Sequence, residues 1–107
     1  MRAGALRHRI EIQRNDGIRD PDSGEIIPGW TTVARVWAEV VDLSGREFWD
    51  SQQVHSEIST RVRIRYQDGI EPTMRVIHGD RTLEIQAVLD PDGRRRELHL
   101  MCRELES

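Results

Sequence analysis

The sequence contains no lysine and a single cysteine, and these absences exclude several kinds of chemistry. All 16 cationic residues are arginine, so the chain offers no Schiff-base lysine, no lysine general base and no phosphate-binding P-loop lysine. Cys102 has no second cysteine to pair with, which rules out a disulfide within the chain and fits a reducing cytoplasm.

Long hydrophobic runs are also missing. No stretch approaches the roughly 18 apolar residues of a membrane span, and no apolar segment follows the charged residues 1–9, so we expect neither a membrane anchor nor a secretory signal. The 19 acidic residues outnumber the cationic ones, giving a net charge of -3. This balance argues against a protein whose main task is to grip phosphate backbones. The 107 residues predict one domain, residues 1–107.

No constellation of residues indicates catalysis or metal binding. His99 and Cys102 are three positions apart, so on a strand their side chains point to opposite faces and cannot chelate one ion. The aspartate-rich segments 20–22 and 90–93 lack the remaining positions of a calcium loop. Neither a nucleophile elbow nor a glycine-rich phosphate loop is present. We therefore expect a protein that is not an enzyme and has no cofactor, metal or catalytic site.

Apolar and polar residues alternate along most of the chain, which is typical of strands with one buried face. Strands are predicted at about residues 8–14, 30–42, 55–66, 73–77, 81–89 and 95–104. Such regular spacing, with turn formers between strands, favours a mainly β fold: a small antiparallel β-barrel of about six strands. In segment 81–89, Leu83, Ile85 and Ala87 are predicted to share the buried face. Residues 15–29 are rich in turn formers and are predicted to be a long loop with a hairpin tip around Ser23-Gly24, and this loop is expected to be a contact element.

One short helix is predicted between the second and third strands. Ser44 and Glu47 form an S-x-x-E capping box, which satisfies free backbone N–H groups at a helix start. The helix would cover about residues 45–54. Its apolar content is thin, with Phe48 and Trp49 as the large side chains, and so short a helix is marginal in water unless it docks on another surface.

Two strands carry candidate contact surfaces. The strand at 30–42 has apolar groups on both faces, which predicts burial on one side and partial cover or subunit contact on the other. On the strand at 55–66, Arg61, Arg63 and Arg65 share one face. Contact with DNA or with acidic subunits is one interpretation, and a solvated face with cross-strand ion pairs to residues such as Glu84 or Glu97 is the other. We favour ion pairs or subunit contact, because the chain is acidic and no stacking aromatics lie on that face.

Segments along nearly the whole chain also occur, in the same order and spacing, in one known family. The segments are Gly4–Arg14; Arg19-Asp20 with Ser23-Gly24; Trp30; Val36–Val40; Leu43–Glu47 with Gln52-Gln53 and Ser56-Glu57; Arg63–Tyr66 with Gly69-Ile70; Met74–Val76; and Asp90–Leu98. Taken together, they resemble the head–tail joining, or head-closure, proteins of tailed bacteriophages and prophages.

The resemblance implies a small β-barrel that oligomerises as a ring in the head–tail connector of the virion. Such a ring lies beneath the portal and adaptor, offers a docking surface to the tail, and in this family closes the DNA channel after packaging. The segment implicated in closure would be residues 43–55. DNA would pass without sequence-specific binding, which an acidic lumen would favour. The protein would reside in the host cytoplasm before assembly.

The expected contact residues, with itself or with portal, adaptor and tail proteins, are Trp30, Trp37, Ser44, Arg46, Glu47, Phe48, Trp49, Gln52, Arg61, Arg63 and Arg65. The alternative function is a small nucleic-acid-binding β-barrel that uses the Arg61/Arg63/Arg65 face.

Overall fold

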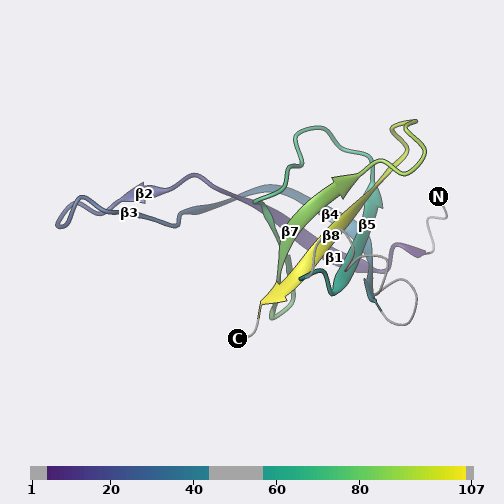
Figure 1. Cartoon of the computed structure of the whole chain (residues 1–107), viewed down its shortest axis with the longest axis horizontal. Coiled ribbons are helices and arrows are strands. Elements are labelled where there is room, and N and C mark those ends of the chain that lie inside the picture. Colours follow the sequence, from purple (N-terminus) through teal and green to yellow (C-terminus); the bar gives the residue numbers. More distant parts are fainter. Residues whose placement is uncertain (1–4, 44–56, 106–107) are drawn as a thin grey trace.

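The structure, a computed structural model, describes residues 5–43 and 57–105. Six antiparallel strands close into a barrel (Figure 1) in the order β1-β4-β5-β8-β7-β6, with β6 pairing back to β1. Their bounds are β1 His8–Asn15, β4 Trp30–Asp42, β5 Thr60–Arg65, β6 Arg75–His78, β7 Arg81–Leu89 and β8 Glu97–Leu105. The predicted six-stranded barrel is confirmed. No helix in this part of the chain is long and apolar enough to cross a membrane.

The barrel interior is filled by side chains that alternate along most of the strands. On β5, Thr60, Val62 and Ile64 are fully buried, whereas the arginines between them face outward. This period-two burial removes apolar side chains from water on one face of each strand. The largest fully buried side chains are Ile10, Ile12, Thr60, Val62, Ile64, Val76, Leu83, Ile85, Leu100 and Cys102.

A two-stranded arm extends from the barrel between β1 and β4 (Figure 1). It consists of β2 (Ile18–Arg19), a turn, and β3 (Ile26–Ile27), and it lengthens the molecule to 48 × 27 × 26 Å. At its tip, the N–H of Asp20 donates to the carbonyl of Glu25 at 2.7 Å, and the N–H of Gly24 donates to the carbonyl of Asp20 at 2.8 Å. The predicted hairpin tip is present, and short paired strands, which were not predicted, lie on either side of it.

Ala87 is not the inward residue that strict alternation predicts. The register of β7 against β8 shifts between Ile85 and Ala87, and Val88 packs against the core instead. A bulge of this kind places an extra residue on one strand and reverses the facing of those that follow.

The predicted third strand is also shorter than expected. β5 begins at Thr60 rather than near residue 55. The predicted helix at 45–54 lies outside the described residues.

Candidate functional site

The base of the arm is held by one asparagine. Asn15 Oδ1 accepts hydrogen bonds from the N–H groups of Gly17 and Gly29, both at 3.0 Å. The N–H of Asp16 donates to the carbonyl of Gly29 at 2.8 Å. A Cβ atom on Gly29 would clash with Cγ1 of Ile18, so glycine is needed for Ile18 to pack against the backbone there. These contacts join the arm to the ends of β1 and β4.

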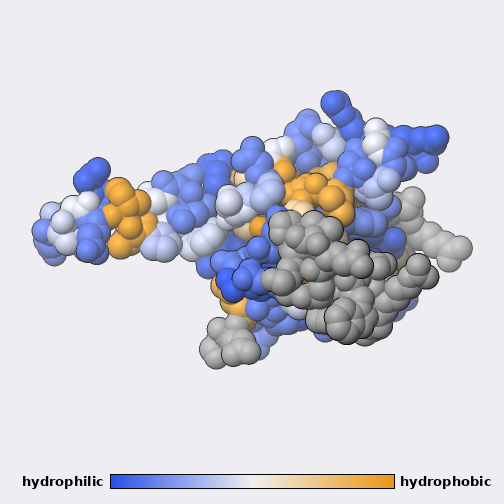
Figure 2. Space-filling model, in the orientation of Figure 1, coloured by the Kyte–Doolittle hydropathy of each residue, from blue (hydrophilic) through white to orange (hydrophobic). Residues whose placement is uncertain are grey.

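The arm carries an exposed apolar patch. Ile18, Ile26 and Ile27 are 54%, 64% and 42% exposed, and they form the hydrophobic area that stands out among hydrophilic residues on the arm (Figure 2). A two-stranded hairpin is marginally stable by itself in water. The loop at 15–29 was predicted to be a contact element, but these three isoleucines were not singled out. The available signal was the pair Ile26-Ile27, which is apolar within a segment of turn formers.

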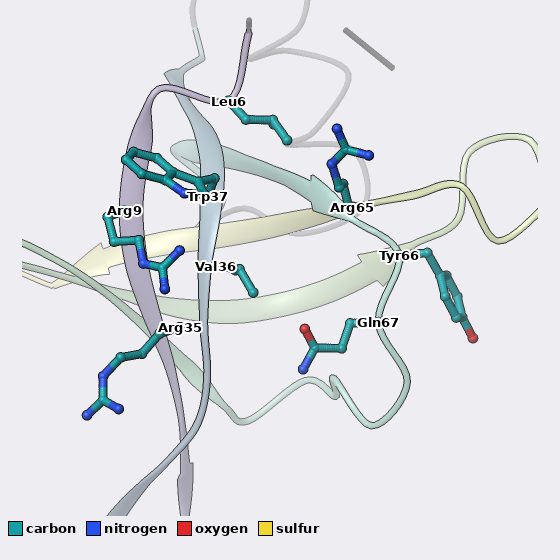
Figure 3. A pocket seen from close by; sticks show the side chains of 8 residues that line it. All are labelled: Leu6, Arg9, Arg35, Val36, Trp37, Arg65, Tyr66 and Gln67. Carbon is teal, nitrogen blue, oxygen red and sulfur yellow. The ribbon is translucent and has the colours of Figure 1, made fainter. Parts of the chain in front are cut away.

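A second surface lies around Trp37 on the outside of the barrel (Figure 3). Trp37 on β4 is 52% exposed, and the guanidinium of Arg9, its register partner on β1, lies 5.5 Å from the centre of its ring. On the other side of β4 is Arg65, one position beyond the last pair of the β4–β5 register, Ala38 with Ile64.

These residues line a depression of about 240 Å³, hereafter the Trp37 pocket, formed by Leu6, Arg9, Arg35, Val36, Trp37, Arg65, Tyr66 and Gln67. Two of the predicted contact residues, Trp37 and Arg65, therefore share one surface.

The three arginines of β5 face outward as predicted, but their surroundings differ. Arg63 Nη2 donates to Glu39 Oε2 at 3.0 Å, and its Nε lies 3.8 Å from Glu97 Oε2, which is an ion-pair distance but too long for a hydrogen bond. Arg65 is exposed, whereas Arg61 is half-buried between Val41 and Met101 in the register. The predicted ion pair to Glu97 is thus present.

Neighbouring charges limit how basic this face is. Burial lowers the pKa of His99 below its ordinary value, although Glu97 opposes the shift. This shift favours the neutral imidazole beside Arg63. Glu84, the other predicted partner, pairs with Arg103 instead. The interpretation of a solvated, ion-paired face describes Arg63 well.

Trp30 lies apart from Trp37, at the base of the arm. The guanidinium of Arg75 lies 4.0 Å from the centre of its ring, and the tryptophan borders a separate groove beside Thr73 and Glu84. Trp30 and Trp37 are seven positions apart on β4, roughly 23 Å along a strand. The structure does not bring them into one site.

The remaining predicted contact residues, Ser44, Arg46, Glu47, Phe48, Trp49 and Gln52, lie outside the described residues. Within residues 5–43 and 57–105, no group of three histidine, cysteine, aspartate or glutamate side chains is placed to hold a metal ion. His99 and Cys102 point to opposite faces of β8, as expected, with Cys102 fully buried.

Comparison with known proteins places this architecture in a family. Residues 1–105 match the family model described as phage head completion protein. The chain is 27% identical over 108 residues to head completion protein gp7 of Enterobacteria phage HK97, covering 96% of each chain.

Among solved structures, protein SF1141 from Shigella flexneri 2a is 34% identical, with a TM-score of 0.74 and coverage of 97% of this chain and 96% of that one. A chain in the virion of a native gene transfer agent particle shares the fold, with a TM-score of 0.63, 19% identity and coverage of 95% and 97%. The protein therefore belongs to the phage head completion protein family, a family of structural proteins of the phage particle and not of enzymes.

Proposed function

We propose that this protein forms a homo-oligomeric ring in the head–tail connector, where it joins the portal and adaptor to the tail. The observation that carries the proposal is the arm, whose three isoleucines are exposed although the barrel has an apolar interior. A closed barrel has no free edge strand through which to associate, so a projecting apolar arm supplies the contact surface instead. Membership of the phage head completion protein family, and the likeness to head completion protein gp7 of phage HK97, support the same role.

The second part of the proposal concerns the DNA channel: DNA passes through the ring, and the ring then closes the channel after packaging. A ring of acidic subunits, each with a net charge of -3, would repel DNA phosphates and let the duplex slide. Reversing lumen-facing carboxylates to arginine should then impair DNA passage, and normal passage in such particles would contradict an acidic lumen. The segment proposed for closure, residues 43–55, lies almost wholly outside the described residues.

Particles that lack the protein provide the main test. If the protein only joins head to tail, electron microscopy should show DNA-filled heads without tails. If it also closes the channel, the same heads should be empty, and DNA released during packaging should be sensitive to nuclease. Normal tailed particles assembled without the protein would contradict both roles, as would electron micrographs of connectors that contain no ring of this chain.

Nucleic-acid binding through Arg61, Arg63 and Arg65 remains the alternative, and the structure gives it little support. Arg63 is engaged by Glu39 and Glu97, and the chain as a whole is acidic. At low salt, we expect the isolated protein not to change the electrophoretic mobility of a short DNA duplex. Binding that weakens steeply as salt increases would instead favour the alternative.

A further inference from the structure

The arm and the Trp37 pocket lie at opposite ends of the molecule. Arg9, which lines the pocket, is near the beginning of β1, and Asn15, which holds the arm, is its last residue. Six positions on a strand span roughly 20 Å, and the arm continues away from the barrel (Figure 1). The arm of one molecule therefore does not reach that molecule's own pocket.

The two surfaces match in their apolar character. The arm exposes Ile18, Ile26 and Ile27, and the pocket offers the half-exposed Trp37 ring. Tryptophan and arginine are the residues that contribute most often to binding energy at protein interfaces, particularly where neighbouring contacts exclude water. Burying the arm against Trp37 would remove apolar surface of both from water.

The two surfaces are also opposite in charge. The pocket lining contains three guanidinium groups and no carboxylate among its described residues. Arg35 is paired with Glu11 at 3.0 Å, which leaves Arg9 and Arg65 as the cations facing the depression (Figure 3).

Near its tip the arm has three carboxylates, Asp20, Asp22 and Glu25. Its one cation there, Arg19, donates to the carbonyl of Gly24 at 3.1 Å. Complementary potentials of this kind steer association and set its register.

We propose that the arm of each copy docks in the Trp37 pocket of the next copy around the ring. Every copy then gives one arm and receives one, which is a heterologous contact that closes into a ring when its rotation is a whole fraction of a turn. The inference rests on the proposed ring and adds its interface: Ile18, Ile26 and Ile27, with Asp22 and Glu25, against Trp37, Arg9 and Arg65.

Cross-linking between copies tests the contact directly. A chain with both Ile26→Cys and Gln67→Cys, assembled on portal–adaptor complexes of the same phage, should give a ladder of disulfide-linked oligomers under mild oxidation. Cys102 should contribute no background because it is buried. The matched control pairs Ile26→Cys with Leu89→Cys, because Leu89 is 47% exposed but lies on β7 and does not line the pocket. This control should give no ladder.

A charge exchange provides the second readout. Glu25→Arg alone and Arg65→Glu alone should each weaken assembly by about tenfold, because each places like charges at the contact. The chain with both substitutions should recover most of the lost assembly. Rescue of this kind is not expected from a folding defect, and the thermal unfolding of all three variants should match that of the wild type.

The outcomes separate this contact from the ring itself. A ladder together with rescue supports the arm–pocket contact. Rings visible by electron microscopy without a ladder, or with cross-links only to portal, adaptor or tail proteins, overturn the contact and leave the ring in place. If the wild-type chain forms no ring on the portal–adaptor complex, both the ring and the contact are refuted.

Discussion

Leu100 and Leu89 lie on neighbouring strands but in opposite surroundings. Leu100 on β8 is fully buried and Leu89 on β7 is 47% exposed, because Leu100 points into the barrel whereas Leu89 follows the β7 bulge and lies opposite His99. Because both residues are leucine, the direction in which each strand presents the side chain decides, at the scale of single residues, how much it contributes to stability.

We expect Leu100→Ala to lower the free energy of unfolding by about 2–5 kcal/mol, because the substitution leaves a cavity in a closed core. Leu89→Ala is the matched control and should change it by at most about 0.5 kcal/mol. Urea unfolding followed by circular dichroism measures both. Equal losses of unfolding free energy in the two variants would contradict the assignment of Leu100 to the inside of the barrel and Leu89 to the outside.

The burial of Cys102 predicts how the stability of the protein depends on pH. Burial raises the pKa of its thiol from 9.0 to about 12, so the folded state keeps a proton that the unfolded state releases. The resulting stability is fully present below pH 9.0 and is lost as pH rises toward about 12.

The wild type should therefore lose stability in that window more steeply than Cys102→Val, by up to about 1.4 kcal/mol per pH unit. Urea unfolding at a series of alkaline pH values measures the difference. Identical slopes would mean that Cys102 is accessible to solvent, and rapid reaction of the native protein with a thiol reagent would lead to the same conclusion.

At the scale of elements, the arm is an addition to a barrel that is complete without it. None of Ile18, Ile26 and Ile27 belongs to the core cluster, and Asn15 already pairs with Trp30 across the β1–β4 ladder. The barrel core should therefore tolerate the loss of the arm.

Replacing residues 16–29 by Asn-Gly, a two-residue turn suited to a hairpin, should leave a folded barrel whose melting temperature is within a few degrees of the wild type. Ring assembly should be lost in the same variant. Thermal circular dichroism and electron microscopy measure the two properties. If the shortened chain does not fold, the arm stabilises the barrel. That result would contradict the inference that the barrel is complete without it.

At the scale of the whole molecule, the arm makes the protein larger than its length requires. The radius of gyration is 14.8 Å, against about 13 Å for a compact domain of this length. The difference reflects an element that lies outside the barrel and is stabilised mainly by contacts at its base.

Small-angle X-ray scattering of the isolated monomer should show this elongated shape, with a longest dimension near the 48 Å of the principal axis. The arm-deleted chain should give a radius of gyration close to that of a compact domain. A wild-type scattering curve that matches a compact sphere would indicate that the arm folds back on the barrel in solution.

The sequence by itself determined the barrel strands and the facing of most of their residues. Alternation along β1, β5 and β8 is regular, and period-two burial is a local property that any single strand displays. It also indicated the family, because short segments in fixed order can be compared without knowing where they lie in space.

Only the tertiary structure decided where the surfaces are. The bulge that turns Val88 inward instead of Ala87 depends on the register with β8, which no single strand encodes. The Trp37 pocket combines Arg9, Trp37 and Arg65 from three strands. The arm is an element because Asn15 accepts a hydrogen bond from the N–H of Gly29, 14 positions away. Contacts of this kind arise from strand pairing, and strand pairing is fixed by the closed barrel as a whole.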